Sequence, residues 1–312
     1  MILSLVVPCF NEEENVFRFF RETENAFSGR NEKLEYVFID DGSSDSTLFN
    51  LEQLFEESPC TAIQIISFSR NFGKEAAIYA GLKNANGDFV CIIDADLQQR
   101  PEVVIEMLNE LENNDGLDCV AAFQDNRHES KLLSFFKSGF YKTINRLSDV
   151  KFVNGASDFR LMRRNMVEAV LSLNEYNRFS KGIFSFVGFN TKYIPYEAQK
   201  RENGKSKWSF IKLVRYALDG IIAFSTKPLK FSVYAGVLSF ISAIVCALFA
   251  LSPGAETYSD TVFLVALFVL GGIILLSLGI LGAYLSKAYT EIKNRPVYII
   301  KTHIERKENG KD

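Results

Sequence analysis

The sequence predicts an α/β domain with a mostly parallel sheet, followed by two helices that span a membrane. Short β-type runs alternate with helical patterns over the first part of the chain, which is typical of a parallel sheet covered on both faces. Two later stretches, residues 231–251 and 261–286, contain no charged residue. At a rise of about 1.5 Å per residue, each stretch is long enough to cross a bilayer core of about 30 Å. A buried helical hairpin in a soluble core is the alternative for this pair.

The alternation gives the elements in order. Strands are expected at residues 4–8, 35–40, 62–67, 89–94 and 119–123, and helices between them at 13–27, 46–57, 74–85 and 101–113. Beyond residue 125 the pattern is less regular, with a helix expected at 131–147, a short strand at 159–162 and a β-prone segment at 188–196. Ligands of such sheets bind outside the carboxyl ends of the strands.

Composition divides the chain into four parts. These are an α/β domain at 1–207, an amphipathic region at 208–228, two transmembrane helices at 229–286 and a basic tail at 287–312. The amphipathic region suits a helix in the membrane interface, and a helix that packs on the core is the alternative. No secretory signal is expected, because the first apolar stretch is short and acidic residues follow it at once.

The flanks of the apolar stretches predict their orientation. Basic residues precede the first stretch and follow the second, whereas residues 252–260 between them contain no Lys or Arg. The positive-inside rule therefore places the α/β domain and both termini in the cytosol.

Charge and cysteine usage exclude other classes. The net charge is −3 and the sequence pI is about 5.7, so no basic field favours nucleic acid. The five cysteines are scattered without a Cys-x-x-Cys pair and are expected to be reduced and mostly buried. With only two histidines, the chain has little scope for a His-based metal site.

Acidic residues follow a buried strand at Asp94-Ala95-Asp96-Leu97-Gln98. Two carboxylates and a carboxamide at this spacing supply hard oxygen ligands that suit Mg²⁺ or Mn²⁺, and such an ion would grip a diphosphate. The alternative is that Asp94 and Asp96 are solvated caps of the next helix, which Pro101 begins.

A second acidic pair, Asp40 and Asp41, ends the strand at 35–40. A carboxylate there can accept a hydrogen bond from a nucleobase N–H group or a ribose hydroxyl. Two like charges at one strand end repel each other unless a ligand or internal donors use them.

Basic residues gather in a loop before the first apolar stretch, at Arg201-Glu202-Asn203-Gly204-Lys205-Ser206-Lys207-Trp208. The loop suits the neutralisation of phosphate. A basic segment beside a membrane also attracts anionic lipid without any specific ligand. Composition alone does not distinguish phosphate binding from this attraction to lipid.

These motifs occur in an order that resembles a known family. They are Val7-Pro8-Cys9-Phe10-Asn11-Glu12-Glu13, Asp40-Asp41-Gly42-Ser43-Ser44-Asp45-Ser46-Thr47, Arg70-Asn71-Phe72-Gly73-Lys74, Asp94-Ala95-Asp96-Leu97-Gln98, Asp158-Phe159-Arg160-Leu161-Met162 and the Arg201 loop. Together they resemble family 2 glycosyltransferases of the polyprenyl-phosphate type, related to dolichol-phosphate mannose synthase and bactoprenol glucosyltransferases. The resemblance runs from Leu3 to about Ile300.

The resemblance implies a GT-A fold, which is a Rossmann-like nucleotide-diphospho-sugar transferase domain. It implies an inverting, Mg²⁺- or Mn²⁺-dependent transfer of one sugar from a nucleotide-sugar to polyprenyl (undecaprenyl) phosphate at the cytosolic membrane face. The expected donor is a UDP-sugar such as UDP-glucose or a UDP-N-acetylhexosamine, although the motifs do not encode the sugar. A homo-oligomer and a flippase partner are compatible with this function, and the sequence identifies neither.

The resemblance also assigns roles to residues at matching positions. Pro8, Phe10, Glu12, Asp40 and Asp41 match positions that hold the nucleoside of the donor, and Lys74 belongs to a substrate-binding motif. Asp94, Asp96 and Gln98 match the motif that binds the metal ion and, through it, the diphosphate. Asp158 and Arg160 match a motif that faces the reacting sugar, and Arg201, Ser206 and Lys207 match a loop that closes over phosphates.

The sequence departs from the family pattern in two places. Relatives commonly have an Arg just after the fifth strand, where this chain has Phe123-Gln124, and Arg127 or Lys131 is the substitute expected to bind phosphate. A Gly-Glu-Tyr near the end of the second membrane helix is Gly282-Ala283-Tyr284 here.

Two other functions are alternatives to a polyprenyl-phosphate glycosyltransferase. A processive polysaccharide synthase would use a Gln-x-x-Arg-Trp motif, which the chain lacks, and more membrane helices. A non-catalytic membrane scaffold of the same fold would be expected to have lost the acidic ligands, which are present.

Overall fold

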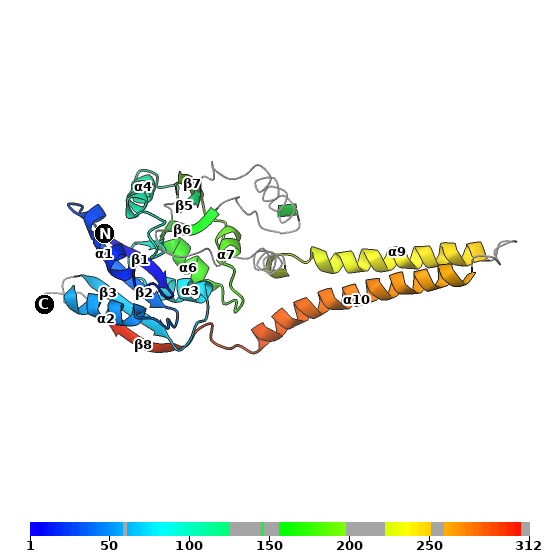
Figure 1. The fold of residues 1–312 in the computed structure, drawn as a ribbon. Helices are drawn as coiled ribbons and strands as arrows, with labels where there is room; N and C mark the ends of the chain where they lie inside the picture. The colour runs from blue at the N-terminus through cyan, green and yellow to red at the C-terminus, as the bar shows by residue number, and fades with distance from the viewer. Residues whose placement is uncertain (59–60, 125–144, 147–155, 198–221, 251–258, 307–312) are drawn as a thin grey trace. The chain divides into compact units, whose positions relative to one another are not determined.

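The computed structural model describes residues 1–58, 61–124, 145–146, 156–197, 222–250 and 259–306. The chain forms two compact units. One unit contains the sheet and the helices that cover it, and the other contains two long apolar helices (Figure 1).

The first unit is built on an eight-stranded sheet with the order β7-β5-β6-β4-β1-β2-β3-β8. The strands are β1 (Ile2–Cys9), β2 (Lys33–Asp40), β3 (Ala62–Phe68), β4 (Phe89–Ile92), β5 (Cys119–Gln124), β6 (Ala156–Arg163), β7 (Thr191–Tyr196) and β8 (Ile300–Glu305). The first four are parallel to one another, β7 is parallel to β5, and β6 and β8 pair antiparallel to β4 and β3. The predicted mostly parallel sheet is confirmed.

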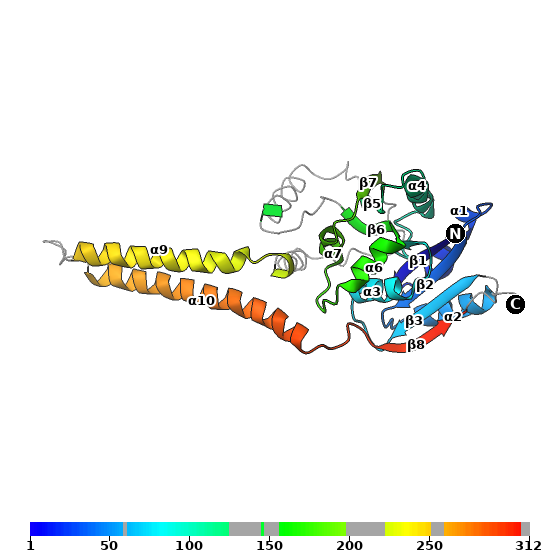
Figure 2. The same ribbon diagram turned by 180° about the vertical axis from the view of Figure 1, so that it is seen from behind.

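Helices cover both faces of the sheet (Figures 1 and 2). They are α1 (Val16–Phe27), α2 (Thr47–Glu57), α3 (Lys74–Asn84), α4 (Pro101–Glu112), α6 (Arg164–Ser172) and α7 (Ser180–Phe186). Alternate residues of a strand point to opposite faces. Leu5 and Phe38 accordingly lie in one buried cluster with residues of α1, α2 and α4, whereas α3 packs against β1 and β2 and contacts α6.

The strand β8 comes from the end of the chain. It pairs with β3 at an edge of the sheet, although the apolar helices separate it in sequence from the rest of the first unit (Figure 1). Only a basic tail was expected for this segment from its sequence. A lone edge strand with exposed residues such as Lys301 and Ile300 carries little periodic signal, so its pairing depends on the sheet that it joins.

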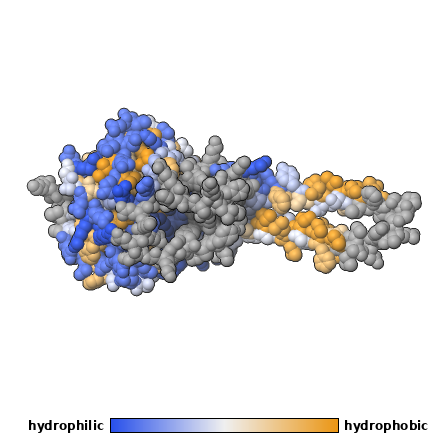
Figure 3. Space-filling view, turned by 45° about the horizontal axis from the view of Figure 1, so that its top comes forward, coloured by the Kyte–Doolittle hydropathy of each residue, from blue (hydrophilic) through white to orange (hydrophobic). Residues whose placement is uncertain are grey.

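The second unit contains α9 (Lys227–Ala250) and α10 (Ser259–Ile292), which contact each other. Both helices are long and apolar enough to cross a membrane, and their described surface is strongly hydrophobic (Figure 3). These helices correspond to the two predicted apolar spans. Because none of the apolar span is buried against protein, a core hairpin does not account for it.

Most predicted elements agree with the structure. The seven expected strands correspond to β1 through β7, the first four helices to α1 through α4, and Cys9, Cys91 and Cys119 are buried free thiols. Nearly all of the helix expected at 131–147, and most of the amphipathic region at 208–228, lie outside the described residues. The short helices α6 and α7 were not predicted.

Gly81 provides a test of the packing of α3 on the sheet. A Cβ atom at Gly81 would lie 2.2 Å from Cγ1 of Val6 on β1, so Gly81→Ala should lower the free energy of unfolding by about 1–3 kcal/mol. Gly116→Ala is the control, since its added atom meets only the Asn114 side chain at 3.3 Å. Thermal unfolding of the detergent-solubilised protein measures both. Equal melting temperatures for the two variants would contradict this packing.

Candidate functional site

The loops that follow β1 and β2 are held together at the carboxyl edge of the sheet. The backbone N–H of Asn11 donates to Oγ of Ser43 at 3.0 Å, and Oδ1 of Asn11 accepts from the N–H of Ser44 at 2.9 Å. Asn11 adopts a φ of 56°, a left-handed conformation that Asn tolerates better than most residues. The N–H of Glu12 donates to Oγ1 of Thr47 at 2.8 Å. Two motifs that are distant in sequence therefore form one surface.

The acidic pair at the end of β2 is used by internal donors. Oδ1 of Asp40 accepts from the N–H of Ser43 at 3.0 Å, and Oδ2 accepts from the hydroxyl of Ser67 at 2.7 Å. The two oxygens of Asp41 accept from the N–H groups of Phe72 and Gly73 at 2.6 and 2.9 Å. Burial raises the pKa of the Asp41 carboxyl, although these N–H groups oppose the shift. Internal donors thus resolve the predicted repulsion.

Gly42 lets the loops after β2 and β3 approach each other. Its φ is +66°, and an added Cβ atom would lie 2.4 Å from the carbonyl carbon of Arg70. The guanidinium of Arg70 lies 4.0 Å from the ring centre of Phe72. Only glycine fits this position, because both the backbone conformation and the lack of space exclude a side chain.

The Asp94–Gln98 segment is an ordered turn after β4. Oδ1 of Asp96 accepts from the N–H of Gln98 at 3.1 Å, and Leu97 between them has a φ of 56°. The side chain that contacts Asp94 belongs to Gln99, the next residue. Its Oε1 accepts from the N–H of Asp94 at 2.9 Å, and its Nε2 donates to Oδ2 at 3.1 Å. Gln99 therefore fixes the conformation of Asp94.

Lys74 joins this turn to β6. Its Nζ lies 2.6 Å from Oδ1 and 2.8 Å from Oδ2 of Asp94, and 3.8 Å from Oδ2 of Asp158. Partial burial would lower the pKa of Lys74, but Asp94 and Asp158 raise it above its ordinary value. The Lys74 side chain is therefore a fixed cation shared by two carboxylates.

Asp158 and Arg160 on β6 each carry one buried polar atom without a hydrogen-bond partner among the described residues. Oδ1 of Asp158 and Nε of Arg160 are buried, and neither atom is hydrogen-bonded to any described residue. Burial would raise the pKa of Asp158, but the cations Lys74, Lys181 and Arg160 lower it. The guanidinium of Arg160 lies 3.7 Å from the ring centre of Phe184, and its Nη2 donates to the carbonyl of Ser157 at 3.0 Å. Buried unpaired polar atoms are unfavourable unless a ligand uses them.

The donor set suits a hard divalent cation, with substrate oxygens completing the coordination. Among the described residues, no group of three or more His, Cys, Asp or Glu side chains could hold a metal. Asp94 and Asp96 are two carboxylates in one turn. Mg²⁺ is commonly bound by one or two carboxylates together with phosphate oxygens and water. Nζ of Lys74 contacts both oxygens of Asp94, so a metal ion bound at Asp94 would share this carboxylate with Lys74.

The remaining predicted residues lie around these contacts or outside the described chain. Pro8 is on β1, Phe10 follows it with an exposed ring, and the Glu12 carboxylate accepts from the Asn15 amide at 2.6 Å. Five residues lie outside the described ranges: Arg127, Lys131, Arg201, Ser206 and Lys207.

Several residues at this site were not predicted from the sequence. Glu75 accepts hydrogen bonds from Ser180, Lys181 acts on Asp158, and Gln99 orders Asp94. Burial, with repulsion from Asp158, raises the pKa of Glu75 to about 7. Glu75 and Gln99 each directly follow a predicted residue, so extending those motifs by one position would have included them. Lys181 lies in a helix that was not predicted.

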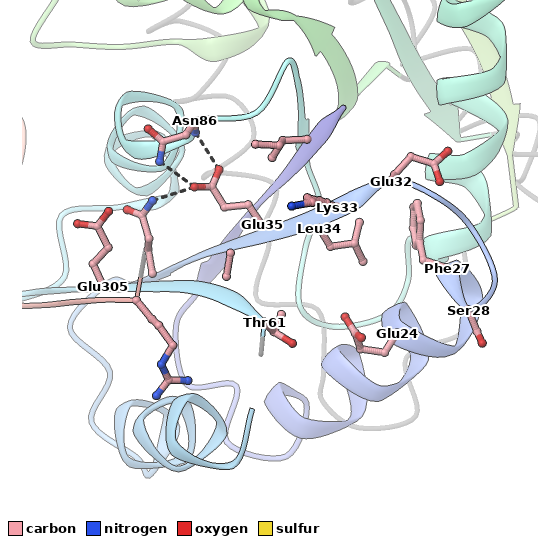
Figure 4. Close-up of a pocket in the computed structure, with 14 residues that line it drawn as sticks. Glu24, Phe27, Ser28, Glu32, Lys33, Leu34, Glu35, Thr61, Asn86 and Glu305 are labelled. Atoms are coloured by element: carbon pink, nitrogen blue, oxygen red, sulfur yellow. Dashed lines mark hydrogen bonds between the residues drawn. The ribbon is translucent and has the colours of Figure 1, made fainter. Parts of the chain in front are cut away.

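A cavity of about 630 Å³ lies at the opposite, amino edge of the sheet and is separate from this site (Figure 4). Its carboxylate Glu35 points toward Asn86, whose Nδ2 donates to Oε1 at 2.8 Å, and Gln64 also donates to Oε1, at 3.0 Å. The hydroxyl of Ser4 donates to the other oxygen. These contacts satisfy Glu35 within the protein, so it ties strands together and offers no ligand site.

Asp41 tests whether the acidic pair supports the loops. Asp41→Asn leaves one oxygen to accept from two backbone N–H groups, so the free energy of unfolding should fall by about 1–3 kcal/mol. The control is Asp115→Asn, which removes a fully exposed carboxylate. Chemical or thermal unfolding measures the difference. An Asp41→Asn protein as stable as the control would show that these hydrogen bonds do not hold the loop.

Comparison with known proteins identifies the family. Residues 4–171 match the model of glycosyl transferase family 2. A putative glycosyltransferase, CsbB, from Bacillus subtilis is 40% identical over 96% of this chain and 91% of its own length. A prophage-derived bactoprenol glucosyl transferase from Shigella flexneri is 39% identical over 96% of this chain and 98% of its own length. A mannosyltransferase structure from Pyrobaculum calidifontis aligns at a TM-score of 0.47 with 16% identity, covering 88% of this chain and 86% of its own. The chain belongs to glycosyl transferase family 2, has the GT-A fold of that family, and is a glycosyltransferase.

Proposed function

We propose that this glycosyltransferase moves one sugar from a nucleotide-sugar to a polyprenyl phosphate at the cytosolic face of a membrane. One observation carries the proposal. A single chain combines the carboxylate site at the strand ends with two helices long and apolar enough to cross a membrane. The near full-length similarity to a protein named bactoprenol glucosyl transferase supports the same acceptor class. A UDP-sugar such as UDP-glucose is the proposed donor.

The loops after β1 and β2 are proposed to hold the nucleoside. Phe10 offers an exposed ring beside Pro8 and Glu12. Because Asp40 and Asp41 already accept internal hydrogen bonds, their contribution is to shape these loops as well as to receive donors from the nucleoside. Each carboxylate oxygen still has a second lone pair for a ligand.

Asp94 and Asp96 are the proposed ligands of Mg²⁺ or Mn²⁺, with Gln98 in the same turn. When bound, the ion would neutralise negative charge on the departing diphosphate. Lys74 lies on the same carboxylate and supplies further positive charge. Arg127, Arg201, Ser206 and Lys207 are proposed to bind phosphate on the basis of the sequence alone.

The proposed reaction is a single displacement. An oxygen of the acceptor phosphate attacks the anomeric carbon, the bond from that carbon to the diphosphate oxygen breaks, and the nucleoside diphosphate leaves with the electron pair. Attack from the face opposite the leaving group inverts the configuration. The acceptor phosphate is already ionised near neutral pH, so a strong general base is dispensable. Asp158, whose pKa is lowered, and Arg160 are therefore proposed to orient the sugar through their unpartnered atoms.

The product formed distinguishes the proposed function from its two alternatives. A processive synthase of the same superfamily would release a long water-soluble polymer, and a scaffold would release no product. A lipid-linked monophosphosugar instead partitions into organic solvent and is labile to mild acid.

The test incubates membranes that contain the protein with labelled nucleotide-sugars and polyprenyl phosphate. One donor should yield an acid-labile, organic-soluble product. Asp96→Asn should lower its formation by about 100-fold or more, because removing one anionic ligand weakens stabilisation of the leaving diphosphate. Asp115→Asn is the matched control at an exposed carboxylate. Transfer by Asp96→Asn at the control rate, with the protein folded in both, would rule out this role.

A further inference from the structure

Glu75 connects the first turn of α3 to the start of α7. It follows Lys74 directly, and its Oε2 accepts two hydrogen bonds from one residue, Ser180. The backbone N–H of Ser180 donates at 2.9 Å, and its hydroxyl donates to the same oxygen. Ser180 is the first residue of α7 and is 4% exposed. The two hydrogen bonds therefore attach α7 to α3 at a buried point.

The helix α7 in turn packs against β6. Its Phe184 lies against the guanidinium of Arg160, and the charge of Lys181 acts on Asp158. Arg178, just before the helix, lies 4.2 Å from the ring centre of Tyr79 on α3 and donates to the carbonyls of Leu173 and Val170. The position of α7 thus determines the surroundings of both β6 side chains.

A carboxylate at Glu75 is costly for the protein to keep. It is partly buried, and Asp158 repels it. Lys74 and Arg178 are the cations that act on it, whereas Ser180 supplies the hydrogen bonds. A neutral side chain at position 75 would avoid the repulsion from Asp158. The acid is therefore best explained by a role in holding the geometry of the site.

We propose that Glu75 is a positioning residue of the transfer site: by holding Ser180 it fixes α7 against β6 and so orients Asp158 and Arg160 toward the sugar. This inference rests on the proposed function, which gives those two residues their task. Glu75 itself does not touch the substrate. Its loss should disturb the sugar end of the donor and leave the nucleoside end, at the loops after β1 and β2, unchanged.

The test compares variants of the full chain in membranes. Glu75→Ala removes both hydrogen bonds and should lower kcat by about 100-fold, the effect expected when reacting groups shift by about 1 Å. The KM for the nucleotide-sugar should stay within about twofold, because the nucleoside loops are intact. Glu75→Gln keeps one acceptor and should restore part of the rate, and Ser180→Ala should cause a smaller loss. Glu102→Gln, an exposed acid in the first turn of α4, is the matched control.

Hydrogen exchange gives a readout that does not depend on activity. Glu75→Ala should speed amide exchange in residues 180–187 relative to Glu102→Gln, while exchange in α1 stays equal. If wild-type protein forms no lipid-linked product with any donor, the proposed function fails, and exchange still decides whether Glu75 fixes α7. The inference itself is overturned if wild type is active and Glu75→Ala matches the control in kcat, if only KM changes, or if exchange in α7 is unaltered.

Discussion

Lys74 places one ammonium group between two carboxylates that belong to different strand ends. It lies within hydrogen-bonding distance of Asp94 after β4 and 3.8 Å from Asp158 on β6. Two partly buried carboxylates repel each other, and a shared cation offsets that repulsion. Lys74 lowers the pKa of Asp158 and pairs with Asp94, so this one side chain connects the two acidic strand ends.

The other loops at the carboxyl edge are ordered by contacts that lead to Lys74. Asn11 joins the loops after β1 and β2, and Asp41 holds the backbone of Phe72 and Gly73 directly before Lys74. Gly42 permits the close approach of these segments. The motifs are thus linked to one another through hydrogen bonds, which is the physical basis for treating them as one site in a family 2 glycosyltransferase.

The sheet and much of the site could be predicted from the sequence, because buried strands and the acidic residues that follow them give strong local patterns. The limits of this prediction follow from contacts between distant residues. The pairing of β8 with β3 depends on the sheet, and the partners of Asp41 lie about thirty positions away along the chain. The shared contact of Lys74 and the hydrogen bonds between Glu75 and Ser180 join elements that no local pattern connects. Gln98 stays a predicted metal ligand, whereas the hydrogen bonds of its neighbour Gln99 to Asp94 were not predicted.

A double-mutant cycle on Lys74 and Asp158 tests the central claim most directly. Transfer rates would be measured for wild type, Lys74→Met, Asp158→Asn and the double variant, each at saturating donor and acceptor. If one cation orients both carboxylates, the second substitution should add no further loss, so the double variant should be no slower than the slower single variant. The transfer rates should then show a coupling free energy of about 1 kcal/mol or more between the two substitutions. Losses that simply multiply in the double variant would show that the two residues act independently and would contradict the account.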